Sequence, residues 1–243
     1  MKLDRKVKYV INSIIVLCVY TVLFEQSRLD VNHSIVEMGD MGELLCAISG
    51  LSVQLMIELK MTRWMLGLSV IFALVGREVY NQLCNLKYIA MIRYGSYRKF
   101  YRSLMNRTVV STLLYGSCGT GIIYVLYAYE GNGQVSNREF LEMSVIYVSQ
   151  LLLLCLLQTL CMILTQGYAA SVLLLVSWFI MAMCGHMVPL LNAIWIWLPA
   201  NWGMYVRGAK LVEGGVPDMA YYIQIGVCVL LWIGVPFVVK RKQ

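Results

Sequence analysis

The chain has 243 residues, of which 60% are hydrophobic and 14% are charged, and its formal net charge at pH 7 is +7. A water-soluble domain of this size cannot bury so much apolar side chain, so the composition excludes that class and predicts a surface that mostly faces lipid. Several apolar runs approach the roughly 20 residues that a helix needs to cross hydrocarbon, and no strand-like alternation suggests a barrel.

We predict an all-α, polytopic membrane protein that forms a single domain over residues 1–243, with six transmembrane helices and further interfacial or re-entrant helices outside. The expected spans, in chain order, are residues 9–24, 64–80, 108–127, 143–164, 168–186 and 219–239. Basic residues precede the first run, but no small-x-small cleavage site follows it, so we expect it to be retained as a span. Six crossings place both termini on one side.

The charges predict which side that is. Fourteen of the 20 Lys and Arg residues lie on the side of the termini, whereas 11 of the 13 acids lie on the other, leaving only Asp4 and Glu78 with the basic residues. This excess follows the positive-inside rule and predicts cytoplasmic termini. The basic residues on this side are Lys2, Arg5, Lys6, Lys8, Arg77, Lys87, Arg93, Arg98, Lys99, Arg102, Arg107, Lys240, Arg241 and Lys242.

Two other apolar segments are not expected to cross. If residues 44–59 crossed, only nine basic residues would lie inside and 11 outside, so we expect an exterior interfacial or re-entrant helix there. Residues 187–199 contain Pro189 and are too short. This last exterior loop also holds three tryptophans that suit a headgroup boundary, which predicts that it is partly embedded. They are Trp195, Trp197 and Trp202.

No motif for catalysis or metal binding is found. The chain lacks a P-loop, an H-E-x-x-H motif and a G-x-S-x-G motif, so we expect no enzymatic activity and no cofactor or metal bound by this chain. The eight cysteines include no C-x-x-C pair. The expected spans are nearly free of charge, and their amides and hydroxyls favour contacts between helices over contacts with a substrate. Candidates for a substrate path are Gln150, Gln158 and His186.

Small residues make the third span unusually narrow on one side. Gly116, Gly119 and Gly121 alternate there with Ser117 and Thr120. Such residues let helix backbones approach closely. The pattern is compatible with packing within the subunit and with a subunit interface.

The most specific region is the expected cytoplasmic loop at 81–107. Residues 86–94 have helical composition, Gly95 can end that helix in the left-handed conformation, and Ser96 is a suitable N-cap for a second helix. One face of the second helix is apolar and comprises Tyr97, Phe100, Tyr101, Leu104 and Met105, whereas Arg98, Lys99 and Arg102 lie off it. We expect this second helix to lie along the inner membrane surface. An ordinary basic segment attracted to anionic lipid is the alternative.

The residues of this loop carry a resemblance. Arg93-Tyr94-Gly95-Ser96, followed by Arg98-Lys99 and aromatic residues, resembles the Arg-x-Gly-Ser-Arg-Lys-aromatic motif of permeases from bacterial peptide-antibiotic (lantibiotic-type) protection exporters. The tract from Trp64 to Tyr80 and the later Leu198-Pro199-Ala200-Asn201 are similar to that group as well. The whole chain resembles the membrane-spanning subunit of type-2 ATP-binding-cassette (ABC) exporters, although the close resemblance covers only about 50 residues.

This resemblance implies an ATP-driven exporter in the bacterial plasma membrane that moves a peptide or amphiphilic antibiotic. It implies a separate ATPase dimer, which binds ATP and Mg²⁺, and a second permease that is identical or different. The ATPase would dock on a coupling helix at 86–94, with residues 1–8 as a connecting interfacial helix. No nucleic-acid partner is expected. The implied coupling residues are Lys87, Tyr88, Ile89, Ile92, Arg93, Tyr94, Gly95 and Ser96.

Two other classes stay open. A stand-alone membrane immunity or sensor protein would bind a peptide without transporting it, and copurification of an ATPase would argue against that class. A secondary transporter is disfavoured because no inverted repeat and no intramembrane carboxylate is evident. Dependence of flux on an ion gradient would favour it. The sequence does not identify the cargo.

Overall fold

The computed structural model describes residues 5–31, 54–85, 87–129, 137–187, 197–203 and 217–238. Every regular element in these ranges is helical, which confirms the predicted all-α class. The six long helices are α1 (Arg5–Val31), α3 (Gln54–Tyr80), α5 (Tyr97–Tyr129), α6 (Asn137–Thr165), α7 (Ala169–Met187) and α8 (Asp218–Val238). The short elements are the π-helical turn η1 (Asn81–Asn85), α4 (Lys87–Tyr94) and the 3₁₀ turn η4 (Pro199–Asn201).

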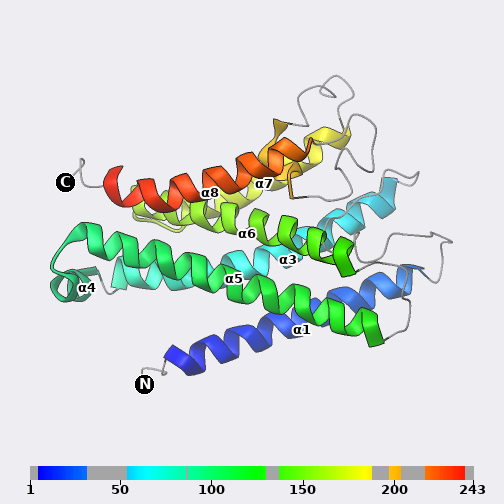
Figure 1. Ribbon diagram of the computed structural model, residues 1–243, viewed down its shortest axis with the longest axis horizontal. Coiled ribbons are helices and arrows are strands. Elements are labelled where there is room, and N and C mark those ends of the chain that lie inside the picture. The colour runs from blue at the N-terminus through cyan, green and yellow to red at the C-terminus, as the bar shows by residue number, and fades with distance from the viewer. Residues whose placement is uncertain are drawn as a thin grey trace.

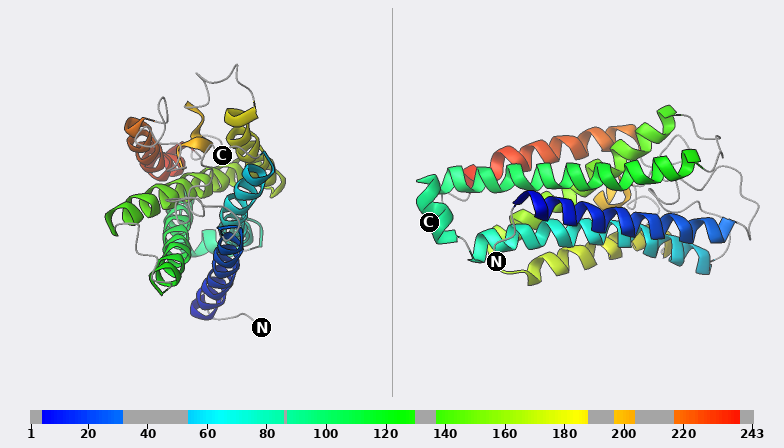
Figure 2. Two further views of the ribbon diagram at one scale, coloured as in Figure 1. Left: turned by 90° about the vertical axis from the view of Figure 1, so that its right-hand side faces the viewer. Right: turned by 90° about the horizontal axis from the view of Figure 1, so that it is seen from below.

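The long helices form an elongated bundle in which each runs opposite to its predecessor in the chain (Figure 1). The short helix α4 lies across one end, which we call the α4 end. The start of α1, the end of α3, the start of α5, the turn between α6 and α7 and the end of α8 all lie at this end, and a perpendicular view agrees (Figure 2). Each of the six expected spans therefore falls on one long helix.

Four helices are long and apolar enough to cross a membrane within the described ranges: Lys6–Glu25, Tyr97–Leu126, Phe140–Thr165 and Asp218–Phe237. The helix α7 adds a shorter apolar stretch, Ala169–Ala182. Large apolar side chains remain exposed on these helices, including Leu230, which is 72% exposed. The chain therefore has the character of a membrane protein.

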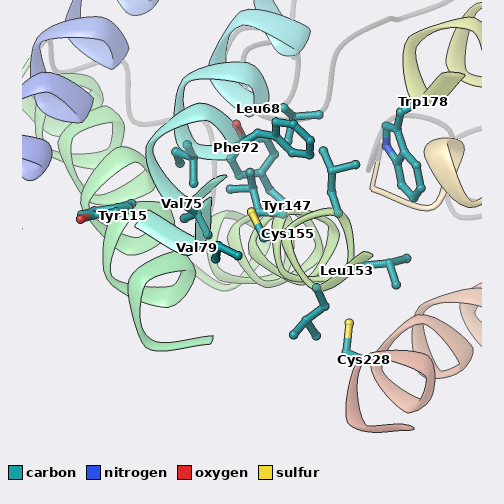
Figure 3. Close-up of a cluster of buried hydrophobic side chains, with 14 of the residues drawn as sticks. Leu68, Phe72, Val75, Val79, Tyr115, Tyr147, Leu153, Cys155, Trp178 and Cys228 are labelled. Atoms are coloured by element: carbon teal, nitrogen blue, oxygen red, sulfur yellow. The ribbon is translucent and has the colours of Figure 1, made fainter. Parts of the chain in front are cut away.

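The centre of the bundle is α6, which contacts α3, α5, α7 and α8. Its leucine-rich sequence is apolar on all sides, as a helix enclosed by other helices requires. Leu68, Phe72 and Val75 of α3 face Tyr147 and Cys155 of α6, because they recur at helical spacing on one face (Figure 3). The core lies along α6 and its neighbours.

Two helices begin earlier than expected. Residues 54–59, which we expected in a separate exterior helix, form the first turns of α3, whereas residues 44–53 lie outside the described ranges. Residues 5–8, expected in a connecting interfacial helix, form the first turn of α1. Neither junction contains a glycine or proline, so nothing ends the helix there.

The segment between α7 and α8, which we predicted to be an exterior loop, is described over residues 197–203. The turn η4 packs into the bundle, where Ala200 and Asn201 are fully buried. Trp202 is only 8% exposed and packs against Ala220 of α8, so its ring is enclosed by protein, and its place at a headgroup boundary stays a prediction. Trp197 is 57% exposed, and Pro189 and Trp195 lie outside the described residues.

Candidate functional site

The predicted helix–turn–helix is present at the α4 end. The helix α4 ends at Tyr94, Gly95 follows with φ +64°, and α5 begins at Tyr97. The left-handed conformation costs little free energy here because glycine has no Cβ. Ser96 caps α5, since its Oγ accepts a hydrogen bond from the backbone N–H of Lys99 at 3.3 Å. We call residues 87–107 the hairpin.

The two arms of the hairpin are held together by Tyr94. Its hydroxyl lies 2.8 Å from Ser103 Oγ, and its ring lies 6.2 Å from the ring of Phe100. These contacts join the end of α4 to the first two turns of α5. The short helix therefore has a fixed place relative to the long one.

The apolar face of the second helix is used differently from the prediction. Phe100, Tyr101, Leu104 and Met105 are each at most 3% exposed and pack into the protein core, whereas Tyr97 is 48% exposed. The helix α5 continues unbroken for 33 residues. The segment is thus a straight extension of the long helix, and its apolar face binds protein where we expected contact with the membrane surface.

The outer face of α4 has no apolar partner within the described parts of the chain. Ile89 is 64% exposed and Ile92 is 85% exposed, and their spacing of three residues places them on one face. Arg93 beside them is also exposed. The side chains of Lys87 and Tyr88 lie outside the described residues. The hairpin therefore presents a small apolar surface next to a cation.

Glu78, which we counted with the cytoplasmic charges, is buried between three helices. It is 8% exposed, Tyr9 of α1 donates to its Oε1 at 3.3 Å, and Ser111 of α5 donates to its Oε2 at 3.2 Å. Next to it, Asn12 donates to the hydroxyl of Tyr115 at 2.9 Å. This cluster was not predicted from the sequence.

A signal for the cluster was present in the helical register. Glu78 follows Ile71 by seven residues and Val75 by three, so it lies on the buried face of α3. Its partners Tyr9 and Ser111 come from other helices, and no local pattern pairs them with it. The bundle therefore buries a carboxylate, although we expected spans that are nearly free of charge.

The two glutamines proposed for a substrate path are fully buried and bind backbone carbonyls. Gln150 Nε2 donates to Pro199 O at 3.1 Å and to Ala200 O at 3.3 Å, and Gln158 Nε2 donates to Phe72 O at 3.1 Å. In this structure both amides join elements of the bundle and line no open path. His186 lies in α7, but its side chain is outside the described residues.

No family model, curated protein or solved structure matches this chain.

Charge is distributed unevenly along the bundle. The described basic side chains at the α4 end are Lys6, Lys8, Arg77, Arg93, Arg98, Lys99, Arg102 and Arg107. At the opposite end, Arg138 is paired with Glu142 at 3.5 Å. The exposed isoleucines of α4 thus lie within the basic region of the molecule.

The glycines of the third span serve packing within the subunit at two positions. A Cβ on Gly119 would lie 2.8 Å from the ring of Tyr20 in α1, and one on Gly116 would lie 3.2 Å from Val148 in α6. A Cβ on Gly121 would meet nothing within 4 Å. The first two allow α1 and α6 to approach α5, whereas Gly121 makes no such contact within the described residues.

Proposed function

We propose that this chain is the membrane-spanning subunit of a type-2 ABC exporter in the bacterial plasma membrane, and that it moves a peptide or amphiphilic antibiotic. The observation that carries the proposal is the hairpin, which holds a short helix with two exposed isoleucines across the basic end of the bundle. The chain supplies no catalytic group of its own. ATP and Mg²⁺ bind to the partner ATPase.

The exposed face of α4 is suited to a protein groove. A short amphipathic helix that inserts two apolar residues into a groove is a recurring mode of recognition. Ile89 and Ile92 are the apolar contacts, and Arg93 is available to pair with an acid of the ATPase. If no partner covered these two isoleucines, their apolar surface would stay in contact with water.

The connections of α4 suit the transmission of movement. On one side Tyr94 holds it to α5 through Ser103, and on the other it follows α3 through the turn η1. Glu78, near the end of α3, is hydrogen-bonded to α1 and α5. When nucleotide closes the ATPase dimer, displacement of α4 would therefore move three helices together as a rigid body.

The proposed orientation puts the α4 end in the cytoplasm, with six crossings and a second permease completing the transporter. Each long helix begins at the end where its predecessor finishes, which six crossings require. The concentration of exposed cations at the α4 end supports the cytoplasmic placement through the positive-inside rule.

Affinity purification in mild detergent from the native host tests the docking. We expect the unaltered chain to copurify with a P-loop ATPase in stoichiometric amount, and Ile89→Ser/Ile92→Ser/Arg93→Gln to lose it. Tyr129→Ser/Leu141→Ser is the matched control, because these residues are 91% and 65% exposed at the opposite end. An ATPase that stays with the triple variant, or that is absent from the unaltered chain, contradicts the proposal.

One observation favours a second candidate, an ion-coupled transporter. Within the described residues Glu78 has no cation within salt-bridge distance, and buried carboxylates in membrane helices often carry protons or ions. The two functions differ in their energy source. A protonophore that abolishes transport while cellular ATP is maintained would favour the ion-coupled function, whereas unchanged transport would favour the exporter.

A further inference from the structure

A shallow pocket opens between α5 and α8 at the α4 end. It is lined by Arg98, Arg102, Trp232, Ile233, Pro236 and Phe237. The helix α5 supplies both arginines, which are four residues apart and so share one face. The helix α8 supplies the apolar wall, at the point where Pro236 removes one hydrogen bond from its ladder.

The two arginines are arranged to bind an anion. The guanidinium carbon of Arg98 lies 3.8 Å from the centre of the Phe237 ring. This stacking orients the guanidinium plane and leaves the N–H groups at its edge free to donate. Arg102 is exposed one turn further along, and no carboxylate of the described residues forms an ion pair with either arginine. Two such groups can bind the oxygens of one phosphate.

The wall beside the arginines has the character of a headgroup region. The indole N–H of Trp232 donates to Asn106 Oδ1 at 2.7 Å. Ile233 and Phe237 are 49% and 48% exposed, and further exposed apolar residues follow along α8 toward its start, including Leu230. A tryptophan with a bonded polar edge beside apolar surface is typical of a membrane interface. Polar and apolar binding surfaces thus adjoin each other.

We propose that this pocket binds the phosphate headgroup of an anionic membrane phospholipid, whose acyl chains lie along the exposed face of α8. Charge complementarity selects the anionic headgroup, and the apolar face of α8 selects a lipid over a free phosphate. Basic pockets between membrane helices on the cytoplasmic side bind such headgroups. This site requires no ATPase and stands apart from the proposed export function.

Native mass spectrometry of the full chain in mild detergent tests the site with phosphatidylglycerol and phosphatidylcholine as probes. We expect the unaltered chain to retain phosphatidylglycerol at least about tenfold better, since each basic group near a membrane surface adds substantially to anionic lipid binding. Arg98→Gln/Arg102→Gln should lose this preference. Arg77→Gln/Lys99→Gln removes the same charge from exposed residues at the same end but outside the pocket, and should keep it.

Three outcomes would overturn the proposal. Equal loss in both double variants would mean diffuse attraction by the basic surface. Displacement of the lipid by millimolar glycerol 3-phosphate would mean a site for free anions. If the glutamine pair fails to fold, tryptophan fluorescence tests the site. The emission of Trp232 is the part that Trp232→Phe removes, and brominated phosphatidylglycerol should quench it more strongly than brominated phosphatidylcholine. Equal quenching by the two lipids contradicts the site.

Discussion

Glu78 shows how one side chain can join three helices. Its two carboxylate oxygens accept one hydrogen bond each, from Tyr9 of α1 and Ser111 of α5. Each oxygen satisfies a donor on a different helix, so the carboxylate holds α3 between its neighbours. Removing it would leave both hydroxyls without their acceptor, that of Ser111 in a buried position and that of Tyr9 in a half-buried one.

We therefore expect Glu78→Ala to lower the free energy of unfolding in detergent by about 1–3 kcal/mol. Glu78→Gln should lower it by less, because the amide oxygen still accepts one hydrogen bond and the amide N–H can donate to the other hydroxyl. Arg138→Ala is the control, since it removes only a surface pair and should change the stability by roughly 0.5 kcal/mol or less. Equal stabilities of Glu78→Ala and the control would show that the carboxylate does not hold the helices together.

Gly76 tests the contact between α3 and α6. A Cβ at this position would overlap the side-chain amide of Gln158, which is fully buried and bonded to Phe72 O. Gly76→Ala should lower the stability by about 1–3 kcal/mol because the packed amide cannot move without losing its hydrogen bond. A denaturation midpoint measures this change.

The matched control is Gly121→Ala, which adds a Cβ where nothing lies within 4 Å and should be neutral or stabilising by up to about 1 kcal/mol. In the double variant Gly76→Ala/Gln158→Ala the overlap is gone, so the two changes should couple favourably. Strict additivity of the two changes would contradict the close contact.

At the scale of elements, the hairpin is the feature that the sequence predicts best. Helix composition in 86–94, the glycine and the serine cap are local signals, and α4, Gly95 and Ser96 all match them. The course of the second helix was not predictable in the same way. An apolar face on a basic helix suits both a membrane surface and a protein core, and only the tertiary structure shows that Phe100 and Leu104 are buried.

Gly95→Ala should lower the stability by roughly 1–2 kcal/mol, because an L-residue is strained at a φ of +64°. Gly95→Asn should lower it less, since asparagine tolerates the left-handed region. Thermal unfolding of the purified chain measures both. Gly226→Ala controls for the added Cβ, which meets nothing within 4 Å there. If the Gly95→Ala variant were as stable as the unaltered chain, the left-handed conformation assigned to residue 95 would be contradicted.

At the scale of the whole molecule, hydropathy predicted where the long helices lie but not how far they extend or what they bury. All six apolar runs fall on helices, since apolar length is a property of the local sequence. The starts of α1 and α3 were placed too late, because polar residues at a helix end do not stop a helix. The partners of Glu78, Gln150 and Trp202 depend on contacts between distant segments, which one sequence does not reveal.

The central claim is that the α4 end lies in the cytoplasm, where an ATPase can reach it. Single cysteines in a chain without native cysteines, labelled in intact cells with a membrane-impermeant maleimide, test this claim directly. Ser96→Cys at the α4 end should react only after the cells are permeabilised, whereas Arg138→Cys, at a side chain that is 89% exposed at the opposite end, should react at once. Labelling of Ser96→Cys in intact cells would contradict the orientation and the exporter function that depends on it.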